Sequence, residues 1–181
     1  MAHEFTKYDL MGGAYHWDPV KAGPDYMAHA EDVAKWITES PVLDIGGGDG
    51  YICSRIRATD RDCMVVDNLP YAVQLANMKG QPAIVGDIMD LPKTVTWRRW
   101  GAIYLGDIIE HLDNQAAAIL ACGALTDIIY IATPPVGTKG SYHTHEFSPE
   151  ELEKFMLNLG WIQTRAQVKH CRIFARYEKT T

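Results

Sequence analysis

The sequence predicts a single α/β domain in which helices cover both faces of a mostly parallel sheet. From Pro41 onward, short runs of strand-forming residues alternate with helical stretches, as in strand–helix–strand units. A glycine-rich turn, DIGGGDG at residues 44–50, follows the first of these runs. The chain has 181 residues, of which 47% are hydrophobic, and this is enough to fill one core.

The elements of the alternating part are short. Strands are expected at residues 42–45, 63–66, 83–85, 102–105 and 128–132, and helices at residues 50–57, 71–78 and 114–122. Because strands that alternate with helices form parallel sheets, we expect these strands to run in one direction.

The C-terminal part predicts one more helix and two closing strands. Ser148, Pro149 and Glu151 supply a capping serine, a proline at the first helical position and a glutamate three residues after the cap. Apolar residues then recur at helical spacing, at Leu152, Phe155, Met156 and Leu159. Gly160 ends this helix, and residues 161–167 and 170–177 are expected to pair as antiparallel strands.

The first forty residues differ in character and leave two interpretations open. Aromatic residues lie among turn formers, at Phe5, Tyr8, Tyr15, Trp17 and Tyr26, and a helical stretch follows at residues 25–37. This segment is either a lid that faces the substrate or a plain N-terminal helix packed on the sheet. In both cases we expect one domain over residues 1–181, with this segment at 1–40 and the sheet at 41–181.

The charge distribution argues against broad binding to nucleic acids or membrane surfaces. The net charge is -6, whereas either partner would require a positive field over much of the surface. The last part of the chain is different, because from Arg165 onward it carries five basic residues and one acidic residue. A local site for an anionic substrate therefore stays open.

The cysteines and the hydropathy pattern indicate the compartment. The four cysteines form no C-x-x-C pair, which favours free thiols over a zinc knuckle or a disulfide framework. No apolar run reaches the roughly 20 residues needed to cross a bilayer, and the N-terminus has no apolar signal core. We therefore expect a cytoplasmic protein that does not bind membranes.

The glycine turn indicates a ligand site, because ligands of open α/β sheets bind beyond the carboxyl ends of the strands. Glycines stand at Gly46, Gly48 and Gly50. The dinucleotide pattern G-x-G-x-x-G would need a glycine at position 51, which is Tyr51, and no Gly-Lys-Ser/Thr follows for a nucleoside triphosphate. The turn is therefore not expected to bind a pyrophosphate or a triphosphate, and a nicotinamide-dependent oxidoreductase is disfavoured.

The segment DIGGGDG resembles the first motif of class I S-adenosylmethionine-dependent methyltransferases. Three later segments, MVVDNLP, VGDIMDLP and IYLGDIIEHL, are similar to the following motifs of that family, so the resemblance covers roughly residues 41–177. It implies a Rossmann-like, doubly wound sheet of seven strands in the order 3-2-1-4-5-7-6, with strand 7 antiparallel.

The resemblance also implies which residues bind the cofactor, S-adenosyl-L-methionine. The acid after the second strand, Asp67, would bind both ribose hydroxyls beside Asn68. Asp87 would accept a hydrogen bond from the adenine amino group, with Ile88 beside the ring. Gly106 and Asp107 would lie near the methionine part.

Two acids flank the glycines of the turn. The carboxylate of Asp44 could pair with the cofactor's amino group or orient the turn, and a purely structural role is the alternative. For Asp49, a cap on the following helix is the simplest role.

A second group of residues follows the fourth strand. Asp107, Glu110 and His111 fall within one turn, and SYHTHEFSPEEL follows downstream. This block resembles the quinone-biosynthesis O-methyltransferases and the small-RNA 3′-end 2′-O-methyltransferases, which implies a divalent metal, magnesium or manganese, held by Asp107, Glu110, His111 and either His143 or His145. Between the two histidines, the resemblance favours His145.

The same residues allow a role without a metal. Glu-His-Leu at this place also resembles class I methyltransferases that use no metal, in which the pair shapes the pocket or the histidine acts as base. In that interpretation His111 or His145 is the general base, and plain packing is the remaining alternative.

These observations favour an S-adenosylmethionine-dependent methyltransferase that acts on a small-molecule acceptor, at an oxygen atom. An RNA-end 2′-O-methyltransferase with a divalent metal is one alternative; the basic C-terminal strands and Arg98-Arg99 favour it, and the overall acidity opposes it. A non-catalytic cofactor-binding module of the same fold is the other.

Overall fold

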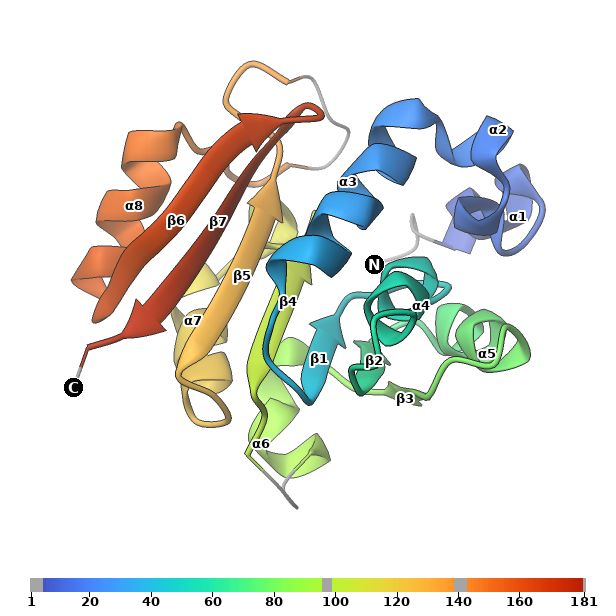
Figure 1. The fold of residues 1–181 in the computed structure, drawn as a ribbon, viewed down its shortest axis with the longest axis horizontal. Coiled ribbons are helices and arrows are strands. Elements are labelled where there is room, and N and C mark those ends of the chain that lie inside the picture. Colours follow the sequence, from blue (N-terminus) through green and yellow to red (C-terminus); the bar gives the residue numbers. More distant parts are fainter. Residues whose placement is uncertain (1–4, 96–98, 139–142, 181) are drawn as a thin grey trace.

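The computed structural model describes residues 5–95, 99–138 and 143–180. Its centre is a seven-stranded sheet in the order β3-β2-β1-β4-β5-β7-β6 (Figure 1). Strands β1 to β5 are parallel to one another, whereas β7 pairs antiparallel with both β5 and β6. The predicted fold class, strand order and antiparallel strand are therefore confirmed.

The strand bounds agree closely with the sequence pattern. The strands are β1 Val42–Ile45, β2 Cys63–Asp67, β3 Ala83–Val85, β4 Ala102–Gly106, β5 Ile128–Thr133, β6 Trp161–Lys169 and β7 Arg172–Lys179. The five parallel strands match within one residue at each end. The turn between the closing strands lies two residues later than expected, at His170 and Cys171, so β6 extends to Lys169 and β7 runs from Arg172 to Lys179. A register shift interrupts β6 between Gln163 and Arg165.

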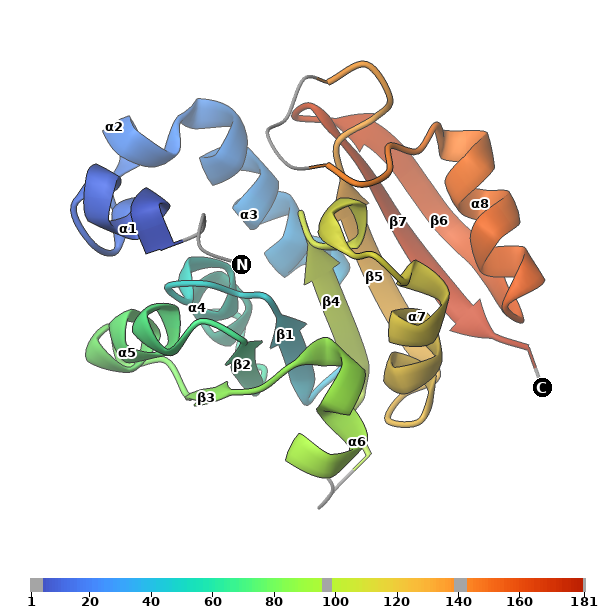
Figure 2. The same cartoon turned by 180° about the vertical axis from the view of Figure 1, so that it is seen from behind.

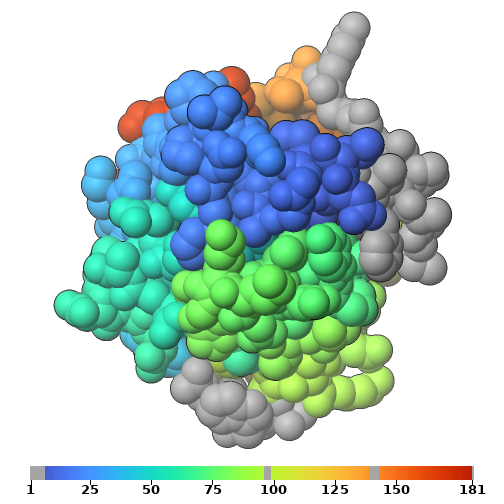
Figure 3. Space-filling view, turned by 90° about the vertical axis from the view of Figure 1, so that its right-hand side faces the viewer, coloured from blue at the N-terminus to red at the C-terminus, as the bar shows by residue number. Residues whose placement is uncertain are grey.

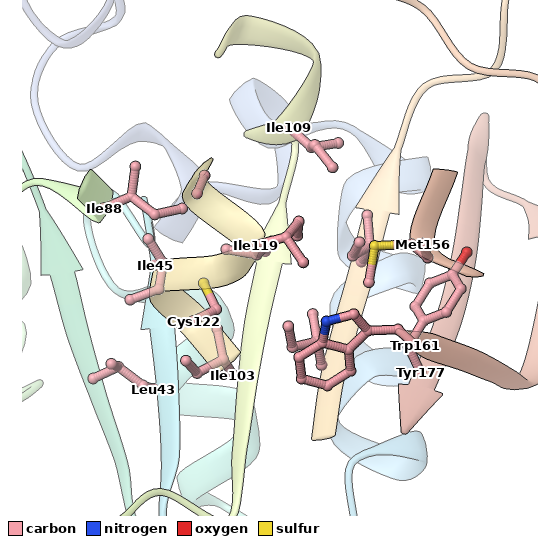
Figure 4. Packing of buried hydrophobic residues seen from close by; sticks show 14 of the residues in the cluster. Leu43, Ile45, Ile88, Ile103, Ile109, Ile119, Cys122, Met156, Trp161 and Tyr177 are labelled. Atoms are coloured by element: carbon pink, nitrogen blue, oxygen red, sulfur yellow. The ribbon is translucent and has the colours of Figure 1, made fainter. Parts of the chain in front are cut away.

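Two layers of helices cover the sheet (Figures 1 and 2). One face carries α3 Pro24–Trp36, α4 Tyr51–Arg57 and α5 Pro70–Met78, and the other carries α6 Leu91–Thr94, α7 Gln115–Gly123 and α8 Pro149–Asn158. Successive residues of β1 alternate between the two cores: Val42 belongs to the core that includes α3 and α4. Leu43 belongs to the other core, where it lies near Ile103 and Cys122 (Figure 4). Both faces are therefore buried, as parallel sheets require.

Helix α8 begins as the sequence predicts. The Ser148 hydroxyl accepts a hydrogen bond from the Glu151 backbone N–H at 3.2 Å, and the Glu151 carboxylate accepts one from the Ser148 N–H at 2.8 Å. Leu152 and Met156 are fully buried on the face that packs against the sheet. This capping box fixes the start of the helix.

The N-terminal segment contains more structure than the predicted helix alone. Short helices α1 Phe5–Met11, η1 Tyr15–Trp17 and α2 Pro19–Ala22 precede α3. Tyr8 and Tyr15 pack in one cluster with Leu69, which precedes α5, and with Ala72 and Leu75 of α5. The segment is thereby attached beside the carboxyl ends of β1 and β2.

Two short helices, η2 Ile88–Asp90 and η3 Ile109–His111, follow β3 and β4. Among the helices of the described residues, none combines the length and apolar character that a membrane span requires. Cys53, Cys63 and Cys122 are buried free thiols, as expected, whereas Cys171 is exposed.

Phe174 of β7 packs against α3 and provides a test of the packing on that face of the sheet. Its fully buried ring stacks on Trp36 of α3 at 4.5 Å between centroids and lies 5.4 Å from the ring of His29. We expect Phe174→Ala to lower the free energy of unfolding by about 3–5 kcal/mol in urea denaturation. Phe174→Leu should lower the free energy of unfolding clearly less than Phe174→Ala. A loss below about 1 kcal/mol for the alanine variant would contradict this packing.

Candidate functional site

A pocket of about 610 Å³ lies at the carboxyl edge of the sheet, where β1, β2, β3 and β4 end. All the residues predicted to bind a cofactor line it: Asp44, Gly46, Gly48, Asp67, Asn68, Asp87, Ile88, Gly106 and Asp107. The structure thus brings into one cavity residues from four different strand ends. Figure 3 shows the N-terminal segment, in dark blue, lying directly on the green surface of the segments near residues 70–90.

The glycine turn leaves the space that the pocket needs. Gly46 and Gly48 have left-handed backbones, with φ of +66° and +56°. A Cβ atom at Gly46 would collide with the side chain of Ile108, and one at Gly48 would collide with the hydroxyl of Tyr8. Only glycine therefore meets both the backbone and the space requirements at these positions.

Asp67 ties the end of β2 to this turn. Its Oδ2 accepts a hydrogen bond from the Gly48 backbone N–H, and its Oδ1 accepts one from the Leu69 N–H, both at 2.9 Å. These bonds fix the orientation of the carboxylate in the pocket wall. Asp87 is exposed and accepts from the Met89 N–H at 2.8 Å, whereas Ile88 beside it is buried.

Asp44 carries a buried carboxylate at the end of β1. The residue is 1% exposed, and Oδ2 has no hydrogen-bond partner among the described residues. Burial, followed by the nearby carboxylate of Asp67, raises its pKa to about 8. Because a cation would favour the charged form, Asp44 is suited to a positively charged ligand group.

Asp49 does not cap the following helix, contrary to the simplest expectation. Gly50 is the N-cap residue of α4, and no side chain caps this helix. Instead, the buried carboxylate of Asp49 accepts from the His16 backbone N–H and contacts His16 Nδ1, each at 3.1 Å, and its carbonyl accepts from Trp17 Nε1 at 2.9 Å. Asp49 therefore holds the N-terminal segment onto the glycine turn.

Aromatic side chains of this segment form one wall of the pocket. Tyr8, Tyr15, His16 and Tyr26 line it, and the ring of His16 stacks on Tyr26 at 4.5 Å between centroids. Burial raises the pKa of the three tyrosines, so their hydroxyls stay protonated. Lys7 also lines the pocket, which sequence reasoning did not identify.

Glu110 and His111 lie on η3 at the edge of the pocket. Glu110 is buried, and its Oε2 accepts from the Thr133 hydroxyl at 2.9 Å. Its Oε1 is buried without a hydrogen bond and lies 3.9 Å from His111 Nε2. Burial, followed by the charge of Asp107, raises the pKa of Glu110. His111 lines the pocket.

The structure places His143, rather than His145, beside His111. The two rings lie 5.1 Å apart, and ligand atoms of Glu110, His111 and His143 all fall within 4.8 Å of one another. His145 is exposed, packs on Phe147 and is not among the pocket-lining residues. The reason is the anchor at Thr144, whose backbone N–H and hydroxyl both donate to the Glu110 carbonyl.

Asp107 is engaged by a residue that sequence reasoning missed. Arg172, at the start of β7, donates from Nε to Oδ1 at 2.8 Å and from Nη2 to Oδ2 at 2.5 Å. Its neighbourhood carried only a general signal, the basic character of the C-terminal strands. Among the described residues, the ligand atoms that gather within 4.8 Å of one another are those of Glu110, His111 and His143, and neither Asp107 nor His145 is in this group.

The buried acid Asp44 gives a prediction about stability. Its pKa is about 8 in the folded protein and 3.8 in an unperturbed carboxyl, so between these values only the folded state holds the proton and stability falls as the pH rises. We expect Asp44→Asn to remove this loss and to raise the melting temperature at pH 8 by about 2–4 °C or more. Near pH 4 the two proteins should melt alike; a lower melting temperature of the variant at pH 8 would contradict this.

The sequence matches no family model and no curated protein. Solved structures, however, resemble it over almost its whole length. Magnesium protoporphyrin IX methyltransferase from Synechocystis PCC 6803 with bound SAH superposes with a TM-score of 0.74 at 15% identity, over 97% of this chain and 94% of that chain.

Two further structures show the same likeness. One is 1,6-didemethyltoxoflavin-N1-methyltransferase of Burkholderia thailandensis, with its substrate and S-adenosylhomocysteine (TM-score 0.71, 18% identity, 100% of this chain and 91% of that chain). The other is an O-methyltransferase from neocarzinostatin biosynthesis with S-adenosylmethionine and a naphthoic acid (TM-score 0.69, 18% identity, 95% and 63%). The chain therefore has the Rossmann-like fold of the S-adenosylmethionine-dependent methyltransferases.

Proposed function

We propose that the protein is an S-adenosylmethionine-dependent methyltransferase that transfers a methyl group to an oxygen atom of a small-molecule acceptor. One observation carries this proposal: the glycine turn, Asp67, Asp87 and the Gly106–Asp107 pair line a single pocket. The structures with the same fold described above bind this cofactor or its demethylated product.

The residues present fit the cofactor. The bare backbone of Gly46 and Gly48 would lie against it, and the fixed carboxylate of Asp67 would bind its ribose hydroxyls. Asp87 would bind the adenine amino group with Ile88 beside the ring. The unpaired Oδ2 of Asp44 would receive the ammonium group, which supplies the partner that this buried atom lacks.

The chemistry asks little of the protein beyond alignment and removal of a proton. When bound, the cofactor supplies an electrophilic methyl group on a sulfonium. The pocket walls must hold the acceptor oxygen in line with that group and exclude water. The N-terminal segment over the pocket supports the lid interpretation, because Tyr8, Tyr15 and Tyr26 line the cavity.

His111 is our proposed general base. It lines the pocket, and the Glu110 carboxylate lies 3.9 Å from its Nε2. A proton taken from the acceptor hydroxyl would give an imidazolium, which the buried negative charge of Glu110 would stabilise. His145 lies outside the pocket lining, so His111 is the better candidate of the two predicted bases.

A divalent metal is the second possibility, favoured by the grouping of Glu110, His111 and His143. Two imidazoles and a carboxylate can bind manganese or magnesium, although magnesium prefers more oxygen ligands. A metal there would orient acceptor oxygens and lower the pKa of an attacking hydroxyl. The experiment on His111 below separates the two roles.

The basic C-terminal strands do not favour RNA over a small molecule. Their cations are engaged within the protein: Arg165 on the ring of Trp36, Lys169 by Asp32, Arg172 by Asp107, Arg176 by Glu39 and Lys179 by the Gly123 carbonyl. To bind the phosphates of an RNA, these side chains would have to leave their present partners in the protein. The small-molecule acceptor is therefore the better proposal.

We also propose that the protein works in a reducing compartment such as the cytoplasm. All four cysteines are free, and three of them are buried. Disulfides are the rule in small secreted domains and are rare in the cytosol.

Cofactor binding tests the proposal directly. We expect saturable binding of S-adenosylmethionine and S-adenosylhomocysteine in calorimetry, and no binding of NADH. Asp67→Asn should weaken both by about tenfold or more, because charge-assisted hydrogen bonds to the ribose are lost. Asp90→Asn, which removes an exposed acid outside the pocket, is the matched control. Binding of NADH alone would overturn the proposal.

His111→Ala, measured with and without chelator, separates base from metal. With a panel of hydroxylated acceptors, we expect the variant to lose about 10²–10⁴-fold in kcat while it still binds S-adenosylmethionine. If His111 acts as base, wild-type activity persists in EDTA and His145→Ala stays close to wild type. If a metal is used, EDTA and His143→Ala both abolish activity, and manganese or magnesium restores the chelated enzyme. Full activity of His111→Ala in EDTA would contradict both roles.

A further inference from the structure

Three residues with unusual backbone conformations gather beside the pocket. In the described part of the chain, the non-glycine residues with left-handed φ are Asp60, Asp107 (+53°), His170 (+52°) and Cys171 (+57°). The last two form the β6–β7 turn, and the next residue, Arg172, binds Asp107. Positive φ at both positions of a two-residue hairpin turn is ordinary, whereas at Asp107 it costs about 1–3 kcal/mol and persists where the surroundings impose it.

The contact between Arg172 and Asp107 has the geometry of a strong, directional pair. The guanidinium reaches both carboxylate oxygens, through Nε to Oδ1 (2.8 Å) and Nη2 to Oδ2 (2.5 Å). The Arg172 side chain is 15% exposed and that of Asp107 is 35% exposed, so the pair is partly shielded from solvent. A bidentate pair of this kind fixes orientation as well as distance, which a lysine would not do.

The turn that carries Arg172 is itself held in place. Asp32 of α3 binds Lys169 Nζ at 2.7 Å and His170 Nε2 at 3.1 Å. The Arg172 guanidinium also donates to the His170 carbonyl at 3.1 Å. Figure 1 shows the tip of the β6–β7 hairpin beside the N-terminal half of α3. The arginine is therefore presented to Asp107 from a braced element.

Asp107 is the pocket residue to which Arg172 and its turn are bound. It lines the cavity directly after Gly106, at the end of β4. Arg172 also lies over the ring of Tyr26, another wall residue, with its Cζ 6.0 Å from the ring centroid. One arginine thus contacts two separate parts of the pocket wall, while it is not itself a lining residue.

We propose that Arg172 is a positioning residue that holds Asp107 in its left-handed conformation and thereby sets the wall of the pocket beside the methionine part of the cofactor. This inference rests on the proposed function. The alternative is that the pair only staples β7 to β4. The two roles differ in what they affect: a purely structural ion pair affects stability alone, whereas a positioning residue also affects affinity for the cofactor.

The first experiment compares two arginines of the same strand. Arg172→Gln removes the charge beside Asp107, and Arg176→Gln removes a comparable pair with Glu39, remote from the pocket lining. We expect both variants to melt at a lower temperature. Only Arg172→Gln should weaken the binding of S-adenosylmethionine and S-adenosylhomocysteine, by tenfold or more in calorimetry. The affinity of Arg176→Gln for both should stay within twofold of wild type.

Glycine at position 107 supplies the decisive background. Because glycine adopts positive φ without help, Arg172→Gln should change cofactor affinity less than twofold when added to Asp107→Gly. The same tenfold loss in that background would overturn the proposal. Arg172→Lys keeps the positive charge but cannot bind both carboxylate oxygens at once, so its affinity for the cofactor should fall by an intermediate factor of about three. This variant replaces Arg172→Gln in both comparisons if the glutamine variant does not fold.

The outcomes separate this inference from the proposed function. Wild-type protein that binds neither cofactor form would overturn the proposed function and this inference together. Wild-type protein that binds, with Arg172→Gln equal to Arg176→Gln in affinity, would overturn the positioning role alone.

Discussion

The pocket depends on main chain without side chains at the carboxyl end of β1. At Gly46 and Gly48 the backbone is left-handed, and any side chain would run into Ile108 or Tyr8. This bare turn leaves open the space onto which the ends of β2, β3 and β4 converge. Because this space exists, residues from the ends of the other strands can contact one and the same ligand.

Three acids surround the turn, and their different environments divide their roles. Asp67 is bound by two backbone N–H groups, and Asp49 is bound by His16 of the N-terminal segment. Asp44 keeps a buried oxygen without a hydrogen bond. The first two acids build the site, and the third is destabilising until a cation arrives, which is the pattern expected where stability is sacrificed for binding. Under the proposed function, that cation is the ammonium group of the cofactor.

The sequence predicted the parts of the structure that local pattern determines. Residues 42–45 and 83–85 are strands with the expected ends, and Ser148 with Glu151 caps α8 as anticipated. Strand order and the grouping of Asp44, Asp67 and Asp87 followed from the resemblance of ordered motifs. The signals for the strand ends and the cap lie within a few residues of those elements, whereas the strand order rests on four motifs spread over residues 41–177.

The features that escaped prediction depend on contacts between distant residues. Asp49 was expected to cap a helix, but His16, 33 positions earlier, takes its carboxylate. His143 lies beside His111 because Thr144 bonds to the Glu110 carbonyl, which spacing alone does not reveal. Arg172 reaches Asp107 across 65 positions. Contacts between distant parts of the chain decide these positions, and the local sequence pattern does not predict such contacts.

A crystal structure of the protein with S-adenosylhomocysteine tests the central claim most directly. The account predicts the adenosyl group against Gly46 and Gly48, the ribose hydroxyls on the carboxylate of Asp67, the adenine beside Ile88 and the amino group at Asp44. A ligand bound elsewhere, or one that leaves Asp67 and Asp87 without contact, would contradict it.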